Sequence, residues 1–219
     1  TITAEDSLVT IVRSALTVTD WGGTQPAFYG HEGAVMPVIA CKFSMDKSGT
    51  AAKQSGMLLD GGSSAVFARG TALARNGIIN ATYRGLNIHD GSRATFVFGD
   101  FSGAGAVGIR AANASLAEGS YAKATGCGEA GASIGGAHAN FDAGDFSNNL
   151  AIGIRAAGGA TVSVGAVAKV SGSGIGLYAT DAATISAPGI IATRCVDYGV
   201  QAIHGGSVDA HNANVSNAG

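Results

Sequence analysis

The feature that most constrains the fold is a phrase that recurs about every 23 residues along the second half of the chain. Each copy begins with a glycine followed by an apolar residue, and the successive steps between these glycines are 23, 23, 22, 23 and 23 residues. The six glycines are Gly85, Gly108, Gly131, Gly153, Gly176 and Gly199. Upstream, Gly33 and Gly56 are also 23 residues apart. A fixed period of this length is typical of repeat architectures, in which each copy is one stacked structural unit.

Within each copy, apolar and polar residues alternate, which predicts short strands with one buried face. Apolar residues stand directly before and after the glycine, as Val107 and Ile109 do around Gly108. A second strand follows a turn of small residues, as in 161–164, and a third, shorter stretch returns toward the next glycine, as in 168–171. One copy is therefore predicted to form one coil.

Stacked coils would hydrogen-bond along the axis about 4.8 Å apart, so that equivalent residues of successive copies form columns. Parallel crossovers are strongly biased to the right hand, and the hexapeptide period of left-handed β-helices is absent. We expect glycine to recur because tight corners need a positive φ and leave no room for a Cβ atom. The sequence predicts an all-β, right-handed parallel β-helix of about eight coils, roughly 40 Å long.

Residues 1–32 lie outside the clear repeat and are expected to form a short N-terminal capping region. Strands are predicted over 7–12 and 15–19, and Trp21 with Phe28 and Tyr29 is expected to cover the open end of the stack. The β-helix itself is expected over 33–219 and beyond it, because the next glycine of the series would fall near position 222, past the last residue.

Two other interpretations of the glycine-rich pattern were weighed. The chain contains 35 glycines, and a high glycine content is typical of a flexible linker. The phased valine and isoleucine columns argue against a linker. The stretch 103–108 matches the dinucleotide-binding pattern G-x-G-x-x-G. It is followed by another strand phrase rather than by the amphipathic helix that a Rossmann fold requires.

Composition excludes several classes of partner. The formal net charge is -2, with 13 lysines and arginines spread singly, so no nucleic-acid partner is expected. No apolar run approaches the roughly 18 residues of a membrane span, so no membrane insertion is expected. Cys41, Cys127 and Cys195 lack the paired spacings of a zinc or redox site and are expected to be free thiols. No metal site and no cofactor are predicted.

The column two residues after each glycine is polar and is expected to project outward as a continuous strip. It contains Asn87, Arg110, Ser133, Arg155, Tyr178 and Gln201. We expect Asn87, Arg110, Arg155, Tyr178 and Gln201 to be the candidate ligand-binding residues, with hydrogen-bond donors and a stacking surface for an elongated polyhydroxylated ligand. The alternative is a strip that is simply solvated or covered by another subunit. His89 and His204, near the turn that follows, are interpreted as polar turn residues.

Glycoside hydrolysis needs two carboxyl groups about 5 to 10 Å apart. The nearest candidates are Glu118 and Asp142, which the repeat places on adjacent coils with an offset of one register position. Asp100, Lys123 and Asp145 each stand eight residues before their glycine. They are expected to stack with alternating sign as a surface ion-pair row, which would contribute little to stability.

The phrases Gly-Ile-Arg-Ala, Gly-Leu-Tyr-Ala and Gly-Val-Gln-Ala are followed by Ala-Gly-Gly-Ala-Thr-Val and His-Gly-Gly-Ser-Val. Over about residues 33 to 219, this pattern resembles the right-handed β-helix shafts of bacteriophage tailspikes and tail fibres, within the broader pectate-lyase-like class. In that family such shafts form homotrimers on virions, bind host surface polysaccharide and sometimes cleave it. The resemblance therefore implies a structural and receptor-binding segment of a virion tail.

Two alternative functions follow from the same fold. A polysaccharide lyase or glycoside hydrolase would need a groove with paired acids, but no lyase-type Asp and Arg motif can be carried over residue by residue. A bacterial surface adhesin would need flanking export and anchoring sequences in the full gene.

Overall fold

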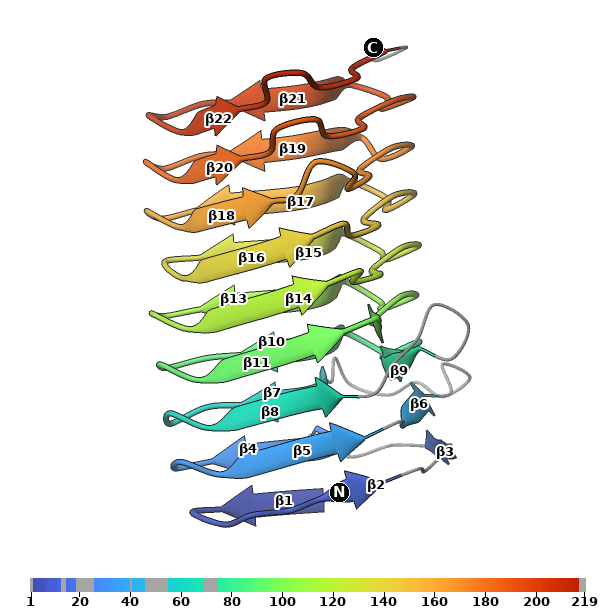
Figure 1. Cartoon of the computed structure of the whole chain (residues 1–219), viewed down its shortest axis with the longest axis vertical. Coiled ribbons are helices and arrows are strands. Elements are labelled where there is room, and N and C mark those ends of the chain that lie inside the picture. Colours follow the sequence, from blue (N-terminus) through green and yellow to red (C-terminus); the bar gives the residue numbers. More distant parts are fainter. Residues whose placement is uncertain are drawn as a thin grey trace.

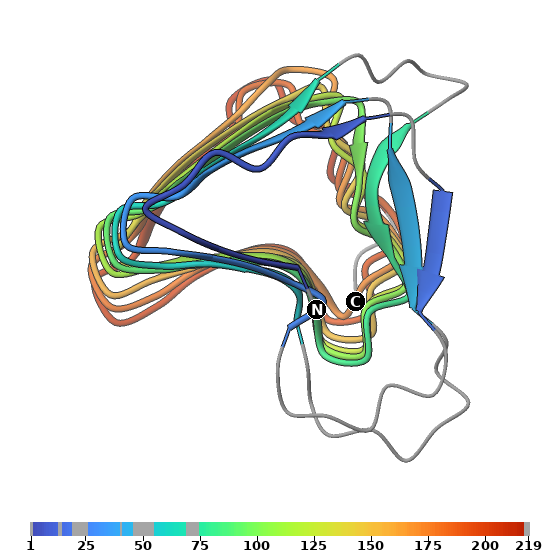
Figure 2. The same cartoon turned by 90° about the horizontal axis from the view of Figure 1, so that it is seen from below.

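The computed structural model describes residues 2–12, 15–18, 26–39, 41–45, 55–68 and 75–216. Every described element is a β-strand, and all strand pairs are parallel. The chain climbs one axis in about eight turns of about 23 residues (Figure 1). Seen from the N-terminal end, the chain runs clockwise as it recedes, so the coil is right-handed (Figure 2). The predicted β-helix is therefore confirmed.

Three sheets form the sides of the coil. Sheet A has nine strands, β1 (Ile2–Glu5), β4 (Phe28–His31), β7 (Ser55–Leu59), β10 (Arg84–Ile88), β13 (Val107–Ala112), β15 (Ala130–Gly135), β17 (Ile152–Ala157), β19 (Ile175–Ala179) and β21 (Tyr198–Ala202). Sheet B has nine strands, β2 (Ile11–Val12), β5 (Val35–Ile39), β8 (Ser64–Ala68), β11 (Arg93–Val97), β14 (Leu116–Ser120), β16 (His138–Asp142), β18 (Thr161–Val164), β20 (Thr184–Ser186) and β22 (Ser207–Asp209).

The third side, sheet C, has four strands, β3 (Ala15–Val18), β6 (Lys42–Met45), β9 (Asn76–Ile79) and β12 (Gly99–Asp100). Isolated bridges continue this side upward through Asp100, Lys123, Asp145, Lys169, Ile191 and Asn214. Each coil therefore has the three sides that the repeat predicted.

Inward-facing columns fill the interior. The column one residue after each glycine contains Leu86, Ile109, Ala132, Ile154 and Leu177, and all five are fully buried. On sheet B, Phe96, Gly119 and Phe141 are successive members of one inward column. A Cβ atom on Gly119 would lie 1.9 Å from Cε2 of Phe96, so the glycine leaves room for the neighbouring ring. A small residue in one coil thus accommodates a large ring in the next, which keeps the core filled.

The repeated glycines have a different role from the one expected. None of the six that define the repeat has a positive φ. Between Gly85 and Gly176, an added Cβ atom would lie 2.4 to 2.8 Å from the carbonyl oxygen of the equivalent glycine in the next coil. The expectation of no room for a Cβ is confirmed, whereas the expectation of a positive φ is wrong at these positions. Close approach of stacked backbones explains the period.

The N-terminal strands belong to the same stack. β1 pairs with β4, β2 with β5 and β3 with β6, so residues 2–18 supply the end coil. Phe28 lies inside the second coil, with its ring centroid 4.4 Å from that of Phe43. Tyr29 is partly exposed on the outer side of the same strand, and Trp21 lies outside the described residues.

Within the described ranges, no helix is long and apolar enough to cross a membrane. Cys41, Cys127 and Cys195 are buried as thiols and form no disulfide with one another. Burial raises the pKa of the Cys195 thiol.

Candidate functional site

The polar strip on sheet A forms as one column. Asn87, Arg110, Ser133, Arg155, Tyr178 and Gln201 follow one another in register from β10 to β21. Toward the N-terminus the column continues through Leu58 to Tyr29. The predicted alignment of these residues is therefore confirmed, and Asn87 differs from the others in being buried.

A hollow of about 310 Å³ opens in this strip between Arg110 and Arg155. Ser133 stands between the two arginines, and its short side chain leaves the space open. The other lining residues are Tyr83, Arg84, Val107, Ala112, Glu129, Ile134, Gly135 and Ala157. Three arginines therefore line one hollow. Tyr178 and Gln201 continue the strip beyond it.

Two of these arginines are held in place by their neighbours. The guanidinium carbon of Arg84 lies 4.2 Å from the ring centroid of Tyr83, and its Nη2 donates a 2.9 Å hydrogen bond to the Tyr83 hydroxyl. Nη1 of Arg110 donates to Oδ1 of Asn87 at 3.3 Å and also contacts Nε2 of His89. Nε2 of His89 also lies 2.8 Å from Oδ1 of Asn87. In the neutral tautomer with the proton on Nδ1, Nε2 can accept from the guanidinium of Arg110, which can only donate. Burial, followed by the charge of Arg110, lowers the pKa of His89 accordingly.

The positive charge in the hollow lacks a protein counterion. Among the described residues, no carboxylate forms an ion pair with Arg84, Arg110 or Arg155, although Glu129 lies at the edge of the hollow. Burial and the charge of Arg84 lower the pKa of Arg110. The Nε atoms of Arg84 and Arg155 are buried without a hydrogen-bond partner. The arrangement is suited to accepting an anionic group.

Tyr83 and Arg84 were missed in the sequence, and His89 was interpreted only as a turn residue. The sequence did contain a signal for Arg84. The residue directly before the repeated glycine is apolar in other copies, as with Val107 and Ile152, but it is an arginine before Gly85. That column also lies outside the main core. Val107 and Ala130 pack in a small separate cluster, because the inward alternation is interrupted at the glycine.

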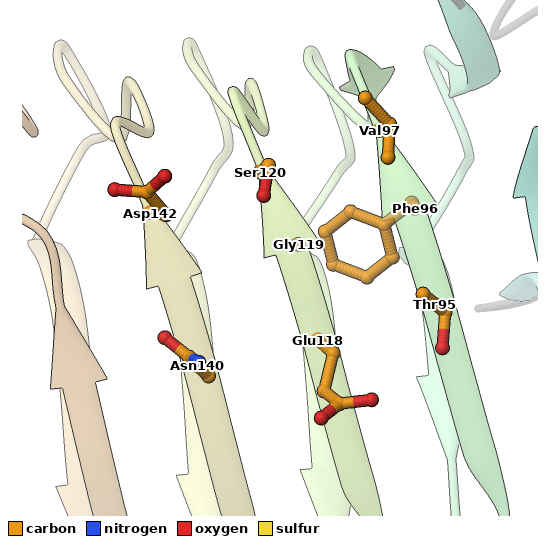
Figure 3. Close-up of a pocket in the computed structure, with 8 residues that line it drawn as sticks. All are labelled: Thr95, Phe96, Val97, Glu118, Gly119, Ser120, Asn140 and Asp142. Carbon is orange, nitrogen blue, oxygen red and sulfur yellow. The ribbon is translucent and has the colours of Figure 1, made fainter. Parts of the chain in front are cut away.

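A second hollow, of about 190 Å³, lies on the outer face of sheet B (Figure 3). Glu118 and Asp142 both line it, together with Thr95, Ser120 and Asn140. Glu118 pairs with Asn140, and Ser120 pairs with Asp142. The offset between the two acids is therefore two register positions, and the expected offset of one is wrong. An even offset keeps both carboxylates on the same face, whereas an odd offset would turn one of them inward.

Strand spacing and rise place the backbones of Glu118 and Asp142 roughly 8 Å apart. Inverting glycosidases hold their two carboxyl groups about 6.5–9.5 Å apart, a separation that the side chains on these backbones would have to adopt. The side chains are not yet arranged as such a pair, since the carboxylate of Glu118 points away from Asp142 (Figure 3). It accepts a hydrogen bond from Nη2 of Arg93 in an ion pair, with the two side chains 34% and 56% exposed. A general acid must instead donate a proton to the leaving group.

An aromatic pair lies at the end of the strands that form this hollow. The rings of Phe98 and Tyr121 stack with centroids 4.7 Å apart, and Tyr121 is 46% exposed. Both residues have a positive φ, which is uncommon for bulky side chains. Their neighbours Val97 and Ser120 line the hollow itself, so an aromatic surface lies beside the two acids.

Asp100, Lys123 and Asp145 stack as predicted, through backbone bridges between successive coils, but Asp100 is buried and does not lie in a surface row. Oδ1 of Asp100 accepts a 3.2 Å hydrogen bond from the backbone N–H of Ser102, and Asp145 makes the equivalent bond to Ser147. These aspartates therefore stabilise turns, and the phenylalanine that follows each one is buried. In the part of the chain that the structure describes, no group of three or more His, Cys, Asp or Glu side chains is arranged to hold a metal ion.

In comparisons with known proteins, no protein-family model matches the chain. No curated protein matches it at a significant level either.

Proposed function

We propose that this chain is a structural and receptor-binding segment of a bacteriophage tail fibre or tailspike, which attaches the virion to polysaccharide on the host surface. The observation that carries the proposal is the in-register polar column from Asn87 to Gln201 along the outer face of sheet A. The resemblance of the repeated phrases to phage β-helix shafts supplies the viral context.

A β-solenoid suits this role for physical reasons. Each coil adds hydrogen bonds along the axis, so the stack is a stiff rod that presents donors at regular intervals of about 4.8 Å. The Arg, Gln and Tyr side chains of the strip can hydrogen-bond to successive sugar hydroxyls, and Tyr178 offers a flat surface for a ring. The ligand that best fits such a surface is a long, polyhydroxylated chain.

We further propose that the shaft is a homotrimer. Leu150 and Val196 are 78% and 70% exposed, and burial of such side chains between subunits would be favourable. Light scattering on the purified protein tests this. A trimer that dissociates on Leu150→Asp or Val196→Asp supports the proposal, and a stable monomer contradicts it.

Binding to polysaccharides purified from bacterial surfaces tests the receptor role. Tyr178→Ala combined with Gln201→Ala should weaken binding about tenfold, as the loss of about 1.4 kcal/mol would. Thr184→Ala, on the sheet B strand that follows β19, is the matched control. If no polysaccharide binds, or if the control weakens binding equally, the strip is not the receptor site.

A second candidate function is cleavage of the bound polysaccharide at Glu118 and Asp142. It is favoured by their placement in one hollow beside the Phe98 and Tyr121 rings. Release of reducing ends or unsaturated sugars, abolished by Glu118→Gln or Asp142→Asn with binding intact, would establish it. A bacterial surface adhesin would share the binding strip, and export and anchoring sequences in the full gene would favour that alternative.

A further inference from the structure

The arginine hollow on sheet A, defined by Arg84, Arg110 and Arg155, concentrates positive charge on a chain whose formal net charge is -2. Arg110 and Arg155 are two coils apart in one column, a spacing of roughly 10 Å along the axis. Arg84 belongs to another column, in register with Val107, and its charge lowers the pKa of Arg110. Three like charges gathered from two columns repel one another, so their grouping needs a compensating interaction.

The protein itself does not supply that interaction. Partly buried arginines in folded proteins are ordinarily paired with carboxylates. Here no described carboxylate forms an ion pair with any of the three guanidinium groups. The Nε atoms of Arg84 and Arg155 also have no hydrogen-bond partner. By contrast, Arg93 on sheet B forms an ion pair with Glu118. The hollow therefore lacks an anion that would satisfy donors already in place.

The donors are held ready for a ligand. Tyr83 fixes Arg84 by stacking and by a hydrogen bond, and Asn87 with neutral His89 positions Arg110. Fixing side chains before binding reduces the entropy lost when the ligand arrives. A planar guanidinium matches a carboxylate or another oxyanion through two parallel hydrogen bonds.

We propose that the arginine hollow binds carboxylate groups of an acidic polysaccharide, one near Arg84 and Arg110 and the next near Arg155. The inference rests on the proposed polysaccharide binding and names the chemical class of the ligand. A spacing of two coils corresponds to about one disaccharide, so carboxylates on alternate sugars would meet the two arginines. The hydroxyls of Tyr83 and Ser133 are placed to bond the sugar ring between them.

A nucleic acid fits the hollow less well. Affinity for a phosphate backbone grows with the number of phosphates neutralised. The column beyond Arg155 continues with neutral Tyr178 and Gln201, so it offers no further cation to a continuous line of phosphates. The positive charge is therefore local, as isolated carboxylates on a sugar chain require.

The test compares a hexamer of galacturonic acid with its methyl ester, which keeps the sugar chain but removes the charge. Calorimetry should detect binding of the acid, at least tenfold weaker binding of the ester, and a loss that increases with salt. Arg110→Gln and Arg155→Gln should each weaken binding of the acid about tenfold. Arg194→Gln, an exposed arginine away from the hollow, is the control for net charge. Cooperative thermal unfolding of each variant establishes that it is folded.

Two further arms separate the possible failures. Inorganic sulfate, followed through the Nε–H signals of the arginines, tests the site alone, and a single-stranded DNA oligomer tests the competing partner. Equal binding of acid and ester would overturn the carboxylate inference and leave the proposed receptor function standing. Sulfate binding at Arg110 and Arg155 without binding of either hexamer would overturn the acidic-polysaccharide inference, and the receptor function would still be decided by the polysaccharides purified from bacterial surfaces. Tighter binding of DNA than of the acid would overturn the choice of polysaccharide.

Discussion

The outer faces of sheets A and B are built from the same repeat, yet they carry opposite charges. The hollow on sheet A is lined by three arginines, and the hollow on sheet B by Glu118 and Asp142. They also differ in how charge is compensated. Glu118 has its own partner in Arg93, whereas the arginines of sheet A have none among the described residues.

The difference teaches where function can be located in a solenoid. Inward columns must remain apolar and complementary in size, because every coil packs on the next. Outward columns carry no such restriction. Packing of the core therefore does not account for an unusual residue in an outward column. A charge with a partner in the protein is accounted for by structure, and a group of charges without one indicates a ligand.

The largest expected effect concerns the core that both faces share. Phe96→Ala removes a fully buried ring that packs against Phe101, with centroids 5.2 Å apart. It should lower the free energy of unfolding by about 3–5 kcal/mol. Thr95→Ala, one residue earlier and facing outward, should change it by about 0.5 kcal/mol or less. Urea unfolding measures both, and equal effects would mean that the inward and outward columns are wrongly assigned.

Replacing one arginine on sheet A and one on sheet B should change the free energy of unfolding by a smaller amount, with opposite signs for the two sheets. Arg110→Gln relieves repulsion with Arg84 and should raise the free energy of unfolding by up to about 1 kcal/mol. Arg93→Gln breaks the exposed pair with Glu118 and should lower it by about 0 to 1 kcal/mol. Paired urea titrations at low salt give the comparison. A loss of stability in Arg110→Gln would show that this arginine is already compensated within the protein.

The smallest effect is on the titration of two histidines near sheet A. A hydrogen bond to Asp60 is the main cause that raises the pKa of His31, and burial is the main cause that lowers the pKa of His89. The contribution of His31 to stability should thus be present below pH 6.5 and be lost as pH rises through its folded pKa. That of His89 should be complete above pH 6.5 and be lost as pH falls toward its folded pKa.

Proton NMR of the two imidazoles checks these directions. Arg110→Gln should move the pKa of His89 upward and leave that of His31 in place, because Arg110 contacts only His89 of the two. Two histidines that titrate together near pH 6.5 would contradict the contrast between their surroundings.

The fold was predictable because its cause is local and repeated. The alternation around each glycine marks the buried column, and the near-constant step gives the number of residues per coil. The register of Glu118 and Asp142 was harder to predict. Three residues separate β13 from β14, but only Gly136 and Ala137 separate β15 from β16. This shorter corner shifts the phase by one residue, which changes the offset from one to two.

The sequence by itself determined the coil, the number of residues per coil and the membership of the columns next to each repeated glycine, because these follow from a period that backbone stacking imposes. Only the tertiary structure decided which residues of different columns share a hollow. Arg84 and Arg110 line one hollow although they belong to different columns, and the hollow stays open because Ser133 is short. Distances between columns depend on bends and corner lengths, and the repeat does not encode these.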